Sequence, residues 1–287
     1  MKIIFFLCGF VSVLTVVVIT IYMLVAGVPA VQKIGLLEML FGTTWRPTAA
    51  DPSFGILYMI LTSIVGTGLA ILLGVPIAVM TAVFISEVAG KRLAAVVKPA
   101  VELLAGIPSV VYGLLGILIV KPAMYQLELF IFRGSETHRF TGGANMMSAV
   151  LVLAIMILPT VVNVSYTSLR GVPTHLRSSS LALGATKLQT VFRVTLPSAS
   201  SGIITAVVLG VGRAIGEAMA ITMVAGNVVN APLPFHSVRF LTTGIVSEMS
   251  YSQGLHRQAL FTIGLVLFVF IMIINLVLNR LLKRAGD

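Results

Sequence analysis

The chain has 287 residues, of which 58% are hydrophobic and only 10% are charged. Its mean hydropathy is +1.08. A typical soluble domain has about 25% charged and roughly 45–50% apolar residues. A soluble fold could not hide this much apolar side chain, because more than half of a globular surface is already apolar. The composition therefore excludes a cytosolic enzyme, a secreted domain and a disordered chain, and leaves an integral membrane protein.

Cysteine, histidine and charge argue against metal, disulfide and nucleic-acid chemistry. The only cysteine, Cys8, excludes a disulfide framework and a multi-cysteine metal site. Four histidines without metal-ligand spacing are predicted to lie in loops: His138, His175, His236 and His256. The net charge of +10 comes largely from basic residues between apolar runs, which membrane topology explains. We expect no metal and no nucleic-acid partner.

Six apolar runs are long enough to cross a bilayer, which takes about 20 helical residues. The predicted spans are 3–26, 55–85, 100–120, 146–165, 198–225 and 259–282. The first run exceeds the roughly 7–15 apolar residues of a cleavable signal, so we predict a retained span. No linker divides the chain. The sequence therefore predicts an all-α integral membrane protein with a single transmembrane domain over residues 1–287.

Basic residues give the predicted spans an orientation. With the N-terminus inside, the inner loops carry 11 Lys and Arg residues and the outer loops carry 7. Inner loops of membrane proteins are enriched in such residues. We therefore predict that both termini are cytoplasmic.

The longest predicted cytoplasmic connection, residues 166–197, has the pattern of two helices with a break. Pro173 and Thr174 predict a helix start, and Gly184 permits a turn before a second helix that leads to Leu196 and Pro197. Such a segment can lie on the membrane surface. It can also place its apolar face in a groove of a cytoplasmic partner. The residues alone leave both interpretations open.

The fifth predicted span contains Arg213 and Glu217, four residues apart, which predicts that they share one helix face. At about 1.5 Å per residue, Arg213 lies roughly 22 Å along this helix. A charge at such depth costs at least about 2.5–3.5 kcal/mol. The two side chains can simply neutralise each other. We favour a second interpretation, in which Arg213 contacts a tetrahedral oxyanion on a transport path and Glu217 orients the arginine.

Several other residues are expected to shape the spans. Small residues every four positions of the fifth span predict close helix packing: Gly202, Ala206, Gly210, Ala214 and Ala218. Pro108 and Pro76 are predicted to break or kink the third and second spans. Trp45 and Arg46 are predicted to lie on the outer side. They can sit at the membrane interface or contact a binding protein, and the sequence leaves both interpretations open.

The 166–197 loop resembles the "EAA" loop of ABC importer permeases. The resemblance rests on the spacing of Gly184, Leu196 and Pro197, with Val194 in the isoleucine position of the motif. It differs at the head of the motif, where three serines replace E-A-A. The resemblance implies an ATPase-docking segment with these residues: Ser178, Ser179, Ser180, Leu181, Ala182, Gly184, Ala185, Thr186, Leu196 and Pro197.

Three further stretches make the resemblance more specific. They are GRAIGEAMA around Arg213 and Glu217, ELLAGIPSVVYG at 102–113, and ALGAT at 182–186. They resemble the C-type permease subunit of phosphate-specific (Pst type) ABC importers. The resemblance implies a MetI-like permease fold, a bacterial plasma-membrane (inner-membrane) location, and a role of Arg213 and Glu217 in phosphate passage. The implied partners are an A-type permease in a heterodimer, two cytoplasmic ATPase subunits and an extracytoplasmic phosphate-binding protein.

The chain has no G-x-x-x-x-G-K-[ST] signature, so ATP-Mg is expected on the partner ATPases and no cofactor on this chain. We expect a transport subunit, not an enzyme, that imports inorganic phosphate by alternating access as the ATPases pull on residues 174–192. One alternative is a permease for molybdate, sulfate or phosphonate. Another is a self-contained channel or secondary carrier, although the absence of a strong internal repeat argues mildly against a carrier.

Overall fold

The computed structural model describes residues 2–286, and most of these residues are helical. The elements of the first half are α1 (Lys2–Ile34), α2 (Leu36–Phe41), β1 (Trp45–Arg46), β2 (Ser53–Phe54), α3 (Leu57–Val83), η1 (Phe84–Val88), α4 (Lys91–Ala105), α5 (Ser109–Leu115), η2 (Gly116–Val120) and α6 (Lys121–Ile131). The second half contains α7 (Met146–Arg170), α8 (Thr174–Ala182), α9 (Lys187–Thr190), η3 (Val191–Thr195), α10 (Leu196–Ser198), α11 (Ser200–Gly216), α12 (Met219–Val224), α13 (Leu241–Glu248) and α14 (Gly254–Gly286). The η elements are single π-helical segments that continue or join α-helices.

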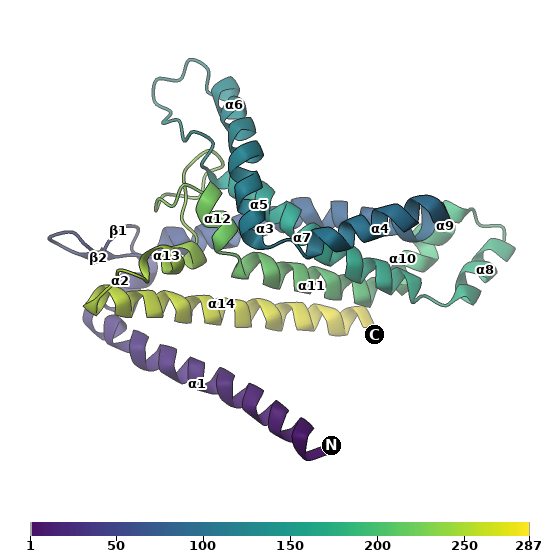
Figure 1. Ribbon diagram of the computed structural model, residues 1–287, viewed down its shortest axis with the longest axis horizontal. Helices are drawn as coiled ribbons and strands as arrows, with labels where there is room; N and C mark the ends of the chain where they lie inside the picture. Colours follow the sequence, from purple (N-terminus) through teal and green to yellow (C-terminus); the bar gives the residue numbers. More distant parts are fainter. Residues whose placement is uncertain (1, 287) are drawn as a thin grey trace.

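Five helical units are long and apolar enough to cross a membrane: Ile4–Ile34, Leu57–Val88, Ser109–Ile131, Met146–Arg170 and Gly254–Val277. A sixth is formed if the pair Lys187–Ser198 and Ser200–Gly216, bent by 67°, counts as one span. The start of α1, the end of α14 and helix α8 lie at one end of the molecule, which we call the terminal end (Figure 1). The two short strands, α2 and α13 lie at the opposite, hairpin end (Figure 1).

Helix α7 forms the centre of the bundle, where α3, α4 and α11 pack on it. Its Ile157 and Val161 side chains are fully buried. Glycines allow the neighbouring helices to approach closely: a Cβ added at Gly74 of α3 would lie 2.8 Å from Ile157, and one at Gly210 of α11 would lie 2.8 Å from Val161. This confirms close packing at Gly210 of the small-residue repeat.

The C-terminal part of α1 packs on the first half of α14, and the N-terminal part of α1 diverges from α14 and exposes its apolar side chains (Figure 1). The Tyr22 and Phe261 rings meet edge to face at 5.5 Å, and Thr262 Oγ1 donates to the Gly27 carbonyl at 2.8 Å. The hydroxyls of Ser12, Thr15 and Thr20 each donate to the carbonyl four residues earlier. Because lipid offers no hydrogen bonds, these internal bonds suit a helix surrounded by acyl chains.

The third predicted span, 100–120, is wrong. Helix α4 ends at Ala105, the chain turns at residues 106–108, and a new helical unit runs over Ser109–Ile131. Pro108 stands at the N-cap of α5 with φ −58° and ψ 143°, and its ring favours a helix start because it fixes φ and lacks an N–H. The break predicted at Pro108 is therefore confirmed, whereas α3 continues through Pro76.

The fifth predicted span, 198–225, is not one continuous helix. Helix α11 ends at Gly216, and Glu217 is extended with φ −74° and ψ 126° before α12 begins at Met219. Ala218 therefore lies outside the helical repeat in which the sequence placed it. The extended Glu217 and the non-helical Ala218 change the direction of the chain at this point.

The hairpin end is closed by a two-stranded antiparallel ribbon in which Trp45 pairs with Phe54 and Arg46 with Ser53. The backbone N–H of Ile56 donates to the Met39 carbonyl at 2.9 Å, which ties the ribbon to α2. The Trp45 ring is 8% exposed and contacts Phe54 edge to face. Trp45 is thus a core residue of this end, whereas Arg46 is exposed.

Candidate functional site

Arg213 lies in the last turn of α11, against the centre of α7. Its Nη1 atom donates to Thr160 Oγ1 at 3.1 Å, and the side chain is half-buried. Among the residues that the structure describes, Arg213 has no carboxylate partner. The guanidinium carries five N–H donors, so a neutral hydroxyl leaves most of its hydrogen-bonding capacity unused.

Glu217 does not share a helix face with Arg213, so that part of the sequence interpretation is wrong. Its carboxylate Oε1 accepts from the Ala220 backbone N–H at 2.9 Å and caps the start of α12. Its carbonyl accepts from Thr242 Oγ1 of α13 at 2.9 Å. The extended backbone at Glu217 turns the side chain out of the α11 register, which a spacing of four residues could not reveal.

The 166–197 loop folds as its sequence predicts, into two helical segments with a break. Helix α8 begins at Thr174 directly after Pro173, and Gly184 has φ +85°, a conformation that favours glycine. Thr186 then forms a capping box with Gln189 at the start of α9. Ser180 and Thr190 hydroxyls lie 3.0 Å apart and join the two segments.

The loop presents apolar side chains outward at the terminal end. Leu183 is 90% exposed and Leu188 is 65% exposed. Ser178, in the first position of the E-A-A motif, bonds only to backbone carbonyls of its own helix, those of Thr174 and His175. The exposed leucines therefore leave an apolar surface available to a partner.

Arg177 fixes the loop to the bundle, and the sequence analysis missed it. Its Nη2 atom donates to Glu87 Oε1 of η1 at 2.9 Å and to the Leu169 carbonyl of α7 at 2.7 Å. The side chains of Arg177 and Glu87 are 19% and 11% exposed. Ninety positions separate the two residues, so local spacing carries no signal of this contact.

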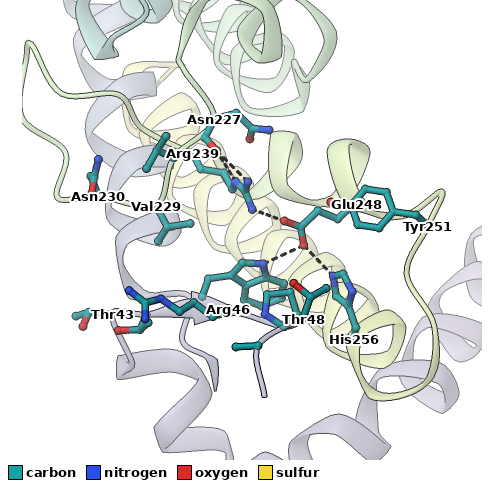
Figure 2. A pocket seen from close by; sticks show the side chains of 15 residues that line it. Thr43, Arg46, Thr48, Asn227, Val229, Asn230, Arg239, Glu248, Tyr251 and His256 are labelled. Carbon is teal, nitrogen blue, oxygen red and sulfur yellow. Dashed lines mark hydrogen bonds and ion pairs between the residues drawn. The ribbon is translucent and has the colours of Figure 1, made fainter. Parts of the chain in front are cut away.

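A cavity of about 820 Å³ opens at the hairpin end and contains a second charged cluster (Figure 2). Its centre is Glu248, the last residue of α13. Glu248 Oε2 accepts from Trp45 Nε1 at 2.9 Å and lies 2.8 Å from His256 Nε2, while its Oε1 pairs with Arg239 (Figure 2). The guanidinium of Arg239 also donates twice to the Asn227 carbonyl.

Burial alone would raise the pKa of Glu248. Hydrogen bonds from Trp45 and His256, together with the charge and hydrogen bond of Arg239, outweigh burial and lower the pKa below the ordinary glutamate value. Because this carboxylate stays ionised, the cluster joins the ribbon, α13 and α14.

The predicted loop position of the histidines holds for His138 and His236. It is wrong for His175, which lies in α8, and for His256, which lies in the first turn of α14. The His256 contact with Glu248 gives its imidazole a structural role at the hairpin end.

These features define a class of protein. Bilayer-length apolar helices surround a cation that has no carboxylate partner in the described chain, and an apolar helical loop is exposed at one end. This is the arrangement of a multi-pass membrane transport subunit. The chain belongs to the family of binding-protein-dependent transport system inner membrane components, whose sequence pattern matches residues 74–286.

Curated relatives extend over most of the chain. The probable ABC transporter permease protein YqgH of Bacillus subtilis is 36% identical over 95% of this chain and 88% of its own length. The phosphate transport system permease protein PstC of Pasteurella multocida is 33% identical over 87% of this chain and 82% of its own length. The PstC protein of Xylella fastidiosa (strain 9a5c) is 34% identical over 92% and 85%, respectively.

Solved structures share the fold at lower identity. A bacterial ABC transporter involved in alginate import matches 98% of this chain and 96% of its own, with TM-score 0.65 and 17% identity. The inward-facing MetNI methionine ABC transporter matches 80% and 94%, with TM-score 0.53 and 19% identity. The predicted MetI-like importer-permease fold is therefore confirmed.

Proposed function

We propose that this chain is the phosphate-conducting C-type permease subunit of an ATP-driven importer, and that Arg213 binds the anion during passage. The proposal rests on one observation: the Arg213 guanidinium has no anionic partner among the described residues, and its only described hydrogen-bond partner is the neutral Thr160. A cation inside the bilayer needs a polar or anionic partner. A tetrahedral oxyanion supplies acceptors that fit the planar guanidinium fork.

The names of the relatives support phosphate as that anion, because several are phosphate transport permeases similar over most of this chain. Glu217 contributes indirectly in this proposal. By capping α12, it holds the break directly after Arg213 and so keeps the guanidinium at the end of α11.

The remaining subunits of the proposed importer are those that the sequence resemblance implies. An A-type permease pairs with this chain, two ATPase subunits bind ATP-Mg, and an extracytoplasmic protein delivers phosphate. The exposed α8–α9 surface is the docking site for one ATPase, and Arg177 connects it to η1 and α7. Closure of the ATPase pair then moves these helices and alternates access to Arg213.

Reconstituted uptake tests the role of Arg213. We expect Arg213→Ala to lower ATP-dependent uptake of labelled phosphate about 100-fold, since it removes charge-assisted bonds worth about 3 kcal/mol in total. Thr160→Val keeps the charge and should cost much less. Normal uptake by Arg213→Ala at normal complex yield would contradict the proposal.

Competition tests the choice of anion in the same vesicles. Unlabelled phosphate should suppress uptake, whereas equal concentrations of sulfate and molybdate should leave most of it intact. Stronger suppression by sulfate or molybdate would contradict phosphate as the substrate and point to another oxyanion permease.

A further inference from the structure

A second group of cations lies at the terminal end, outside the site at Arg213. A cavity of about 330 Å³ opens between η1, the first half of α4 and the end of α7. It is lined by the cationic side chains of Lys91, Lys98 and Arg170, and the described lining contains no carboxylate. The hydroxyl-bearing Ser86 and the phenol of Tyr166 complete its polar wall.

The charges of this cavity are available to a ligand. Lys91 and Arg170 form no ion pair among the described residues. Lys98 forms a 3.6 Å pair with Glu102 in which both side chains are about half exposed, and its Nζ lies 5.0 Å from the centre of the Tyr166 ring. Exposed pairs of this kind contribute little. Lys91 is also the first residue of α4, where free backbone N–H groups and the helix dipole favour an anion.

One face of α7 leads from Arg213 to this cavity. Thr160, Asn163, Thr167 and Arg170 recur at intervals of three or four residues, so they lie along one side of the helix. All four are partly or fully exposed, whereas Val161, Val162 and Ser165 on the other sides are buried. Thr160 bonds Arg213 at one end of this row, and Arg170 lines the basic cavity at the other.

Asn163 stands in the middle of the row with an unused amide. Its side chain has no hydrogen-bond partner within the described part of the chain, although α7 is otherwise the most buried of the spanning helices. A free amide at membrane depth is expected where the helix faces water or a polar solute. This face of α7 is thus polar from Arg213 to the terminal end.

We propose that Lys91, Lys98 and Arg170 form a second oxyanion site, which receives the phosphate group after Arg213 along the Thr160–Asn163–Thr167 face of α7. The proposal rests on the proposed function for its direction and its substrate. Three cations and the α4 N-terminus match the charge of a phosphate group. A phospholipid headgroup offers the same chemistry, so the experiment has to separate the two sources.

The first test measures phosphate at the site without transport. Ala95 lines the cavity, and Cys8 is the only native cysteine, so Ala95→Cys in a Cys8→Ser chain gives one thiol at the site. In the assembled importer in phosphatidylcholine nanodiscs, inorganic phosphate at about ten times its dissociation constant should slow maleimide labelling about tenfold, because the thiol reacts only when the site is empty. Lys98→Gln should abolish the protection. Unprotected labelling would overturn the proposal.

The second test measures transport in two lipid compositions. The triple variant Lys91→Gln, Lys98→Gln, Arg170→Gln should lower ATP-driven phosphate uptake about tenfold in vesicles of phosphatidylcholine alone. Arg92→Gln, a neighbouring cation that does not line the cavity, is the matched control and should leave uptake unchanged.

The outcomes are separable. A triple variant that is normal in phosphatidylcholine and defective only when phosphatidylglycerol is present would assign the cations to a lipid headgroup and overturn the proposal. Normal uptake in both lipids would also overturn it. If the unsubstituted importer takes up no phosphate in any lipid, the proposed function itself fails, whatever the labelling at Ala95→Cys shows.

Discussion

Among single residues, Glu248 gives the clearest prediction, because three side chains from separate elements converge on its carboxylate. Its neutralisation removes the charge that pairs with Arg239 and leaves one acceptor oxygen in place of the two that Trp45, Arg239 and His256 contact. Its side chain is 7% exposed. Glu248→Gln should therefore lower the free energy of unfolding at pH 7 by about 3 kcal/mol, as expected when one partner of a buried pair is removed.

The direction of the pKa shift of Glu248 sets the pH dependence. Its pKa is lower in the folded protein than the ordinary value of 4.5, so its stabilisation is complete above that value and is lost as pH falls through the lowered pKa. In detergent, the melting temperature should fall more steeply below about pH 4.5 for the native chain than for Glu248→Gln. Glu38→Gln, an exposed glutamate of α2, is the control. Parallel curves for the native chain and Glu248→Gln would contradict this prediction.

At the scale of elements, Arg177 joins the proposed docking loop to the bundle. One guanidinium nitrogen bonds both η1 and the end of α7, so we expect a movement of α8 to be transmitted to two spanning units. The E-A-A glutamate is absent from this loop, and the partly buried Arg177–Glu87 pair is a charge contact between the loop and the spans.

A double-mutant cycle tests this connection. Arg177→Met and Glu87→Gln should each lower the phosphate moved per ATP hydrolysed several-fold, while the ATPases still co-purify. Because both changes break the same contact, the double variant should be no worse than the more severe single variant; a non-additivity of about 0.5–3 kcal/mol is usual for such pairs. Arg193→Gln, an exposed cation of the same loop, controls for charge. Fully additive effects would contradict a shared role.

Sequence patterns located most elements, and their failures have physical reasons. Apolar length identified the spans because lipid requires it, and Pro173, Gly184 and Thr186 marked the helices α8 and α9 through local backbone preferences. The third span was misplaced because apolarity continues across the Gly106–Pro108 break, so hydropathy alone could not show which side of the break crosses the bilayer.

The site was predictable to the extent that it depends on one residue. Arg213 could be identified from the sequence because a charged side chain within an apolar run costs free energy in the membrane and therefore indicates a function. The environment of Glu217 was not predicted, because the extended backbone at Glu217 itself ends the helix that would have aligned it with Arg213. The contacts Trp45–Glu248 and Arg177–Glu87 join residues far apart in the chain. A single sequence does not show which distant residues contact each other, so these contacts could not be predicted.

At the scale of the whole molecule, the remaining question is which end faces the cytoplasm. The corrected third span, Ser109–Ile131, encloses Lys121, which the sequence count had assigned to the outer side. The five spans also enclose Lys33 and Arg257 from the outer count and Arg170 from the inner count, so the outer count of Lys and Arg falls from 7 to 4 and the inner count from 11 to 10. This change strengthens the positive-inside bias and supports a cytoplasmic terminal end.

Single-cysteine labelling in a Cys8→Ser chain tests the orientation. Thr48→Cys lies exposed in the hairpin-end ribbon turn, and Ser179→Cys lies exposed on α8. A membrane-impermeant maleimide added to intact spheroplasts should label Thr48→Cys alone, and both residues after permeabilisation. Labelling of Ser179→Cys in intact spheroplasts would reverse the orientation. The exposed leucines of α8 and α9 would then face away from ATP, and the docking role and the order of the two oxyanion sites would fail together.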